Sequence, residues 1–446
     1  MGKPTGFIDY PRQAANDRPA AQRIADYEWI HTCLSEEARK EQAGRCMDCG
    51  VPFCQTPVKI NGAELGCPLR NLIPEWNGQL WNDNLPLALE RLTKTNSFPE
   101  FTGYVCPALC ERACNCAKSS DASVSVNDNE RYIIDTAFEQ GLMQPKVPAK
   151  RSGKTIAVVG SGPAGLTVAT LLNQRGHSVT VYERDCRPGG LLVYGIPSMK
   201  LPKEVVARRI ALLEAEGIEF RCGVNVGAEG ADITTDQLAA QYDAVVLAIG
   251  AQEPRRVAYE TAARGVYYAL DFLGASACDL LGEVPLGPAL NAQGKVVAVV
   301  GAGDSANDCI AVALRQGASD VLQLIRRPAS DYGPMNDYAH VEAAAAFDHD
   351  IRRFGTQISS VVADESGNLT QLVLSTPDGE QTVDAQMVVV ASGFSGAETD
   401  ALAEGANIFQ AGDMATGATL VVKAMAHARK AAAQVDTFLT GYSTIK

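Results

Sequence analysis

Eight of the 13 cysteines in this 446-residue chain are crowded between positions 46 and 116. In a reducing compartment, such crowding indicates metal or redox chemistry rather than structural disulfides. Zinc sites usually take their ligands as two close pairs, whereas cysteine triplets and Cys-Pro steps are typical of [4Fe–4S] clusters. We therefore predict two [4Fe–4S] clusters, with a zinc site or plain structural thiols as the alternatives. The spacing is Cys46-x2-Cys49-x4-Cys54, then Cys67-Pro68, then Cys106-Pro107-x2-Cys110-x3-Cys114-x-Cys116.

A glycine loop after the apolar run 155–159 opens a helical pattern, which is the context of a dinucleotide-binding fingerprint. In that fingerprint the first glycine makes the turn, the second lets a pyrophosphate approach, and the third allows close helix–strand packing. The helix N-terminus adds N–H groups and a positive dipole. Glu183 ends the next strand, where a carboxylate can accept a hydrogen bond from an adenosine ribose. The predicted contacts are Gly160, Gly162, Pro163, Ala164, Gly165 and Glu183.

A second loop of this kind follows the run 296–300, with Ala306 in the third glycine position. Its second strand ends in Arg326 and Arg327 rather than in an acid, and guanidinium groups suit a 2′-phosphate. A solvated basic strand end is the alternative. The opposite signatures predict FAD at the first loop and NADPH at the second, with hydride passing between the two rings and no catalytic side chain required. The predicted NADPH contacts are Gly301, Gly303, Asp304, Ser305, Arg326 and Arg327.

Two further turns are candidates for flavin contact. A short strand near the C-terminus ends in Gly412-Asp413, and a long Ala-rich helical pattern, residues 419–439, follows it. A carboxylate at this turn could reach the ribityl or phosphate arm of the flavin, while a common Gly-Asp turn is the alternative. Another apolar strand ends at Gly250. We predict that Gly250, Gly412, Asp413 and Thr419 contact the cofactor.

These motifs must be positioned by two kinds of folded unit. Residues 1–150 are rich in Cys, Pro, Trp and charge, with short helical patterns and few strand signals, and a Pro/Lys linker covers 144–152. From residue 154 the order strand, glycine loop, helix, strand occurs twice. We therefore predict an α/β fold class with two Rossmann-like dinucleotide-binding domains, preceded by a mainly α-helical iron–sulfur domain.

Composition excludes several partner classes. The net charge of −13 argues against nucleic acid and anionic membrane, and we see no apolar run of 18 residues that could span a bilayer. Residues 1–10 lack the basic and apolar pattern of a signal peptide. We expect a cytoplasmic protein.

Several motifs together resemble the small (β) subunit of NADPH-dependent glutamate synthase and, more distantly, the electron-input half of dihydropyrimidine dehydrogenase. The resemblance covers nearly the whole chain. It rests on the segments 3–7, 46–54 (CMDCGVPFC), 106–111 (CPALCE), 189–197 (GGLLVYGIP, with Gly190 and Leu191 as expected cofactor contacts), 411–413 and 420–422.

The resemblance implies that the FAD-binding domain is interrupted by the NADPH-binding domain. It implies ranges of 1–150 for the helical domain with two [4Fe–4S] clusters, 151–255 and 385–446 for the FAD-binding domain, and 256–384 for the NADPH-binding domain. It also implies a large, FMN-containing amidotransferase subunit as partner. Electrons would pass from NADPH to FAD and through the clusters to that FMN, for reductive synthesis of glutamate from glutamine and 2-oxoglutarate.

The same resemblance suggests the cluster ligands. One cluster would use Cys46, Cys49, Cys54 and Cys114, and the other Cys67, Cys106, Cys110 and Glu130. Cys116 is the alternative to Glu130 as the eighth ligand. The chain departs from the family pattern over residues 331–348 and at Lys423, where an aromatic residue is usual.

Two rival functions stay open at this point. One is an NAD(P)H-dependent FAD/iron–sulfur reductase that feeds a ferredoxin or another oxidoreductase. The other is a scaffold or regulatory protein that binds nucleotide without turnover. The chain shows no Cys–His pair suited to amide hydrolysis, so we expect that it cannot release ammonia from glutamine alone.

Overall fold

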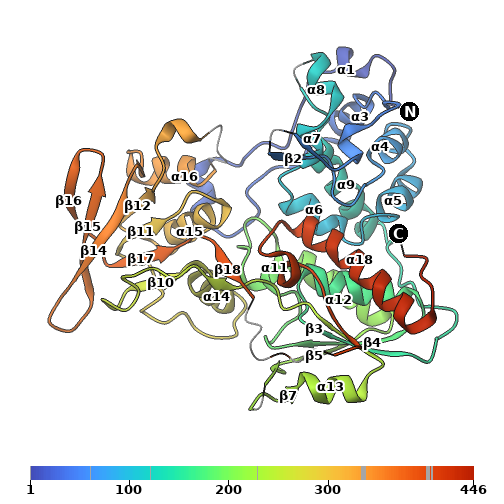
Figure 1. Cartoon of the computed structure of the whole chain (residues 1–446). Helices are drawn as coiled ribbons and strands as arrows, with labels where there is room; N and C mark the ends of the chain where they lie inside the picture. Colours follow the sequence, from blue (N-terminus) through green and yellow to red (C-terminus); the bar gives the residue numbers. More distant parts are fainter. Residues whose placement is uncertain are drawn as a thin grey trace.

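The N-terminal part of the chain folds mainly into short helices (Figure 1). The structure is a computed structural model that describes residues 2–60, 62–120, 122–228, 230–332, 338–397, 402 and 405–445. Prolines stand at the first or second position of α4, α5 and α6, where a missing N–H costs no hydrogen bond. The elements are α1 (Gly6–Asp9), α2 (Ala20–Arg23), α3 (Glu36–Gly44), α4 (Ile73–Trp81), α5 (Leu85–Thr93), α6 (Pro99–Val105), α7 (Leu109–Arg112), α8 (Asn115–Ser120) and α9 (Val126–Glu139), with a hairpin of β1 (Val58–Ile60) and β2 (Ala63–Leu65).

The first dinucleotide-binding unit is built on a parallel sheet of five strands in the order β19-β8-β3-β4-β5. Its central strands are continuous apolar runs because both faces are covered. Three helices pack on one face and α13 on the other. The strands are β3 (Thr155–Val159), β4 (Ser178–Glu183), β5 (Glu219–Cys222), β8 (Ala244–Leu247) and β19 (Ile408–Gln410), and the helices are α10 (Pro163–Gln174), α12 (Lys203–Ala215), α13 (Thr235–Gln241) and α18 (Val421–Thr440).

The second unit has a parallel sheet in the order β10-β17-β11-β12-β13. Helices cover one face, and an antiparallel three-stranded sheet covers the other. The parallel strands are β10 (Val266–Tyr268), β11 (Val296–Val300), β12 (Asp320–Ile325), β13 (Arg352–Phe354) and β17 (Met387–Val390); the helices are α14 (Ala269–Leu280), α15 (Asp304–Arg315) and α16 (Tyr338–Phe347); the antiparallel strands are β14 (Gln357–Ala363), β15 (Leu369–Thr376) and β16 (Gly379–Asp384).

The predicted fold class is confirmed, because strands of the second sheet lie in sequence between β8 and β19 of the first. One boundary differs from the predicted ranges. Strand β17 falls in the segment 385–446 that we assigned to the FAD-binding domain, yet it pairs with β10 and β11 of the second sheet. Apolar character alone cannot decide which of two parallel sheets a strand joins. The chain returns to the first unit beyond β17, where β18 (Phe394–Gly396) pairs with β9 (Glu253–Pro254).

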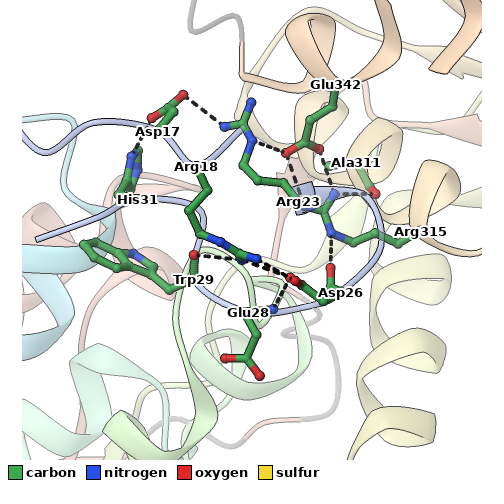
Figure 2. A network of polar contacts seen from close by, with 10 residues as sticks. All are labelled: Asp17, Arg18, Arg23, Asp26, Glu28, Trp29, His31, Ala311, Arg315 and Glu342. Atoms are coloured by element: carbon green, nitrogen blue, oxygen red, sulfur yellow. Dashed lines mark hydrogen bonds and ion pairs between the residues drawn. The ribbon is translucent and has the colours of Figure 1, made fainter. Parts of the chain in front are cut away.

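Part of the helical unit also packs against the second dinucleotide-binding unit. Residues 16–32, which we call the N-terminal arm, reach across to the second unit (Figure 1). Ile30 belongs to the apolar core formed by α14, α15 and α16. Figure 2 shows Arg23 of the arm in an ion pair with Glu342 of α16 at 3.2 Å, while Arg315 of α15 donates to Glu342 at 2.7 Å and to the carbonyl of Asp26 at 2.8 Å. The predicted range 1–150 therefore includes a segment that packs on the second unit.

The rest of the helical unit shares one apolar core with the first sheet. Trp76 and Phe101 lie in the same cluster as Leu166 of α10 and Met425 of α18. A fully buried ion pair between Arg209 and Glu100 joins α12 to α6. In the described part of the chain, no helix has the length and apolar character needed to cross a membrane.

Candidate cofactor sites

The first glycine loop has the geometry that each glycine position requires. Gly160 has φ +96°, in the region that favours glycine, and a Cβ there would lie 2.6 Å from the carbonyl oxygen of Ala248. A Cβ on Gly165 would lie 1.9 Å from the carbonyl oxygen of Gly160, so only glycine lets α10 pack this close to β3. Next to Gly162 a Cβ would meet nothing within 4 Å, which leaves open space in front of the helix N-terminus. Pro163 is the first residue of α10.

Glu183 lies at the tip of β4, beside this loop, and is buried. Its carboxylate accepts hydrogen bonds from the backbone N–H and the hydroxyl of Ser161, and from the N–H of Asp185. Ser161 also accepts a hydrogen bond from the N–H of Gly189 at 2.8 Å. Ser161 thus connects the predicted ribose acceptor to the segment 189–197. Sequence reasoning missed it, because a serine inside a glycine loop carries no signal of its own.

The segment 189–197 closes against the same loop. A Cβ on Gly190 would lie 3.0 Å from the Cα of Gly162, and Gly190 has φ +53°. Leu191 begins the short helix α11 (Leu191–Tyr194). Burial lowers the pKa of Lys203 to about 7, and its ammonium donates to the carbonyl of Leu192 at 2.9 Å and to the carbonyl of Ile196. The half-buried side chain of Lys203 therefore helps to hold this segment in place.

The C-terminal turn meets the start of α10. A Cβ on Gly412 would lie 2.4 Å from the Cβ of Ala164, so this turn too requires glycine. Asp413 accepts from the N–H of Thr419 at 3.0 Å and from its hydroxyl at 2.5 Å, which orients the entry to α18. His427 accepts a hydrogen bond from the N–H of Gly412 at 3.1 Å and so helps to position this turn. No motif in the sequence indicated this role, because the five histidines are scattered singly. Gly250, with φ +78°, follows β8 at the same edge of the sheet, since all five strands are parallel.

The second glycine loop repeats this geometry. Gly301 has φ +137°, and a Cβ there would lie 2.4 Å from the carbonyl oxygen of Ala391. Beside Gly303 there is again open space, and α15 begins at Asp304. A pocket of about 60 Å³ lies at this end of the sheet, lined by Ser305 together with Tyr268 and Gly393.

Arg326 and Arg327 follow β12 and are exposed. The Arg327 guanidinium lies over the ring of Tyr332, 4.9 Å from its centroid. Among the described residues, neither guanidinium has an ion-pair partner, so both are available to an anion. Residues 333–337, within the segment that departs from the family pattern, lie outside the described residues.

A buried polar contact joins the two dinucleotide-binding units. Lys200, just after the segment 189–197, forms a 2.9 Å ion pair with Asp308 of α15. Tyr338 of α16 donates to the same carboxylate at 2.6 Å. Asp308 and Tyr338 are both buried. This contact fixes the segment 189–197 relative to the helix that starts at the second glycine loop.

The cysteines form two separate groups. In the first, burial and then the nearby thiols of Cys46, Cys114 and Cys49 raise the pKa of Cys54, and burial raises the pKa of Cys46 to about 12. Cys116 lies beside Cys114 and accepts from the Arg45 guanidinium at 3.7 Å. The structure thus places both Cys114 and Cys116 with the first triplet.

The second group lines a small pocket formed by Cys67, Cys106, Cys110 and the carboxylate of Glu130. Burial raises the pKa of Cys67 to about 11, that of Cys106 to about 12 and that of Glu130 to about 7. Glu130 accepts from Asn96 at 2.8 Å and from Thr102 at 2.5 Å, which hold it toward the thiols. Neither Cys114 nor Cys116 lines this pocket.

These donor sets fit iron–sulfur clusters. Buried thiols do not ionise without a compensating positive charge, and a bound metal supplies it. One group offers four cysteines beside a fifth, and the other offers three cysteines and one carboxylate. The second group also contacts α18, because Val422 in the first turn of that helix lines its pocket. Lys423, the departure from the family pattern, pairs with Glu64 of the β1–β2 hairpin.

Two family models match the chain. Residues 23–142 match dihydropyrimidine dehydrogenase domain II, 4Fe-4S cluster, and residues 154–428 match pyridine nucleotide-disulphide oxidoreductase.

Curated relatives match over 97–100% of this chain. The glutamate synthase [NADPH] small chain of Bacillus subtilis is 43% identical, with 100% of both chains covered. That of Escherichia coli K12 is 33% identical over 97% of this chain and 98% of its own. Glutamate synthase [NADH] of Schizosaccharomyces pombe is 37% identical over 99% of this chain, which spans only 23% of that protein.

Among solved structures, FprA of Mycobacterium tuberculosis in complex with NADPH has a TM-score of 0.51. It is 19% identical and aligns with 65% of this chain and 85% of its own. This likeness concerns the fold of the two dinucleotide-binding units.

Proposed function

Because the chain belongs to the family of NADPH-dependent glutamate synthase small chains, we propose that it is the electron-input subunit of such an enzyme. It oxidises NADPH and delivers the electrons to a large amidotransferase subunit for glutamate synthesis from glutamine and 2-oxoglutarate. FAD supplies the conversion from a hydride, which carries two electrons, to single electrons that [4Fe–4S] clusters can carry.

The contact between α18 and the second cysteine group carries this proposal. Val422 follows closely after the turn of Asp413 and Thr419, which we propose as flavin contacts, and it lines the pocket of Cys67, Cys106 and Cys110. The two predicted redox sites therefore share one helix terminus. We propose that FAD is held by Gly160, Gly162, Pro163, Ala164, Gly165, Glu183, Gly190, Leu191, Gly250, Gly412, Asp413 and Thr419.

We further propose that the second cysteine group is the cluster nearer the flavin and the first group the one nearer the partner. Cys116 of the first group belongs to α8, which lies at the far end of the helical unit from α18 (Figure 1). Glutamate synthase [NADH] of S. pombe supports the proposal of a partner chain, because this chain spans only 23% of that protein.

The decisive experiment is anaerobic purification of the chain with and without the large subunit from the same organism. Alone, the flavin-loaded chain is expected to oxidise NADPH with an artificial electron acceptor and to form no glutamate. With the large subunit it is expected to form glutamate from glutamine and 2-oxoglutarate. A flavin-loaded chain that oxidises no NADPH would support the scaffold reading. Activity with the artificial acceptor but no complex with the large subunit would support a reductase for another partner.

The preference for NADPH rests on Arg326 and Arg327. Changing both to alanine should raise the KM for NADPH at least about tenfold and leave that for NADH nearly unchanged, since only NADPH carries the 2′-phosphate that a guanidinium binds. Steady-state kinetics with both nucleotides measures the split. Arg353→Ala, on the neighbouring strand β13, is the control for loss of a surface charge. Equal effects on both nucleotides would rule out the 2′-phosphate role.

A further inference from the structure

Residues 199–203, which we call the connector, pack into both dinucleotide-binding units at once. Met199 is fully buried in the apolar core formed by α14, α15 and α16 of the second unit. Leu201, two residues later, is fully buried in the core of the first unit. The N–H groups of Lys200 and Leu201 both donate to the carbonyl of Pro197, at 3.0 and 3.1 Å. The connector therefore joins the end of the segment 189–197 directly to the second unit.

Lys200 makes the polar contact of the connector. Its side chain is 18% exposed and pairs at 2.9 Å with Asp308, whose side chain is 7% exposed. Burial by itself lowers the pKa of Lys200, but Asp308 and Asp304 raise it above its ordinary value, so the ammonium stays charged. The two acids stand four residues apart on α15 and so lie on one face of that helix. Asp304 directly follows Gly303, so Lys200 acts on the turn that opens the proposed NADPH site.

Neighbouring groups hold the ion pair and the connector in one geometry. Tyr338 of α16 donates to the same oxygen of Asp308, Oδ1, that pairs with Lys200. The N–H of Ile30, in the N-terminal arm, donates to the carbonyl of Met199 at 3.1 Å. At the other end of the connector, Lys203 donates to two carbonyls of the segment 189–197. A buried polar network with several partners of this kind is rigid, whereas an exposed ion pair is not.

We infer that Lys200 is a positioning residue for hydride transfer: through Asp308 it sets the segment 189–197 against α15, and so sets how the flavin and nicotinamide rings meet. The inference rests on the proposed function, in which FAD lies at that segment and NADPH at the start of α15. In the reaction a hydride leaves NADPH, which becomes NADP⁺, and the flavin takes up its two electrons. Lys200 neither gives nor takes a proton in this step. Its effect comes from distance, because a misplacement of about 1 Å can slow a reaction about 100-fold.

Lys200→Met in the flavin- and cluster-loaded full chain tests this, because it keeps the length of the side chain and removes its charge. Anaerobic stopped-flow absorbance measures flavin reduction over a range of NADPH concentrations. The limiting rate is expected to fall at least about tenfold, while the concentration for half-maximal rate stays nearly unchanged. Lys154→Met is the matched control. Lys154 also forms a 2.9 Å ion pair, with Asp243, but at the opposite ends of β3 and β8 from the glycine loop, so its loss should leave the limiting rate unchanged.

A second measurement needs no turnover. When the flavin is first reduced with dithionite, added NADP⁺ gives a long-wavelength charge-transfer absorption if the two rings stack. This absorption should be strong in the original chain and weakened in Lys200→Met, at equal flavin and iron content. A merely structural role would instead lower the flavin or iron content and leave the absorption per bound flavin the same.

Asp308→Asn removes the other charge of the pair and keeps its shape, so it decides the question if Lys200→Met does not fold. It should show the same slow limiting rate, and the double variant should be no slower than either single variant, because the two residues act as one unit. An unchanged limiting rate in both single variants would overturn the inference. So would weaker NADPH binding at an unchanged limiting rate, which would make Lys200 a binding residue. If NADPH does not reduce the flavin of the original chain, the proposed function itself fails, and this inference with it.

Discussion

At the scale of single residues, Glu130 decides how the second cysteine group is completed. It is the carboxylate in the pocket of Cys67, Cys106 and Cys110, and two hydrogen bonds hold it there. Glu130→Gln should remove one cluster and so about half of the bound iron, because a neutral amide is a poor ligand for iron. Iron analysis and electron paramagnetic resonance of the anaerobic protein measure the loss.

Cys116→Ser is the comparison variant. Cys116 lies with the first group, which already has four other cysteines, so the variant should keep its full iron content. Loss of a whole cluster in Cys116→Ser, together with full iron in Glu130→Gln, would show that Cys116 is the eighth ligand.

At the scale of elements, two glycines at the junction of β3 and α10 have different predicted roles: Gly165 in helix–strand packing and Gly162 in cofactor binding. A methyl group on Gly165 would lie 1.9 Å from the carbonyl oxygen of Gly160, so α10 would have to move. Gly165→Ala should lower the free energy of unfolding by about 1–3 kcal/mol, a typical cost of overpacking, and should lose flavin. Urea unfolding of the flavin-free protein measures the first effect.

Gly162→Ala is the matched change one turn earlier in the same loop. Its backbone, at φ −65° and ψ −179°, suits any residue, and the new methyl group meets no protein atom within 4 Å. Stability of the flavin-free protein should stay within about 0.5 kcal/mol of the original, as for substitutions that disturb no contact. The flavin absorbance should fall, because the methyl group occupies the space in front of the helix N-terminus. Normal flavin content would mean that the pyrophosphate does not approach here.

At the scale of the whole molecule, the N-terminal arm ties the helical unit to the second dinucleotide-binding unit. Glu342 is fully buried between Arg23 and Arg315 (Figure 2). Glu342→Gln leaves two buried guanidinium groups without their shared counter-charge, and breaking a buried pair costs about 3–5 kcal/mol. We expect faster cleavage of the arm by protease and a lower midpoint in urea.

Arg18→Met provides the contrast. Arg18 pairs with Asp26 at 2.6 Å, but both side chains are partly exposed, and such pairs contribute about 0–1 kcal/mol. Protease sensitivity of this variant should stay close to that of the original. If Glu342→Gln behaves in the same way, the arm does not hold the two units together.

The sequence by itself determined the parts that depend on neighbours along the chain. The apolar runs 155–159 and 296–300, each predicted to precede a glycine loop, are strands at these bounds in the structure, and both glycine loops open helices. These features follow from periodicity and from local backbone geometry, so no distant contact is needed to recognise them. The cysteine spacing likewise indicated iron–sulfur chemistry.

Only the tertiary structure decided what depends on residues far apart in sequence. It brought Glu130 to Cys67, Lys200 to Asp308 and Glu342 to Arg23, and it placed β17 in the second sheet rather than the first. None of these pairs has a periodic or spacing signal, because each contact arises from how separate elements pack. The eight crowded cysteines are therefore brought into two groups only when the chain folds. The same is true of the contact between the second group and α18.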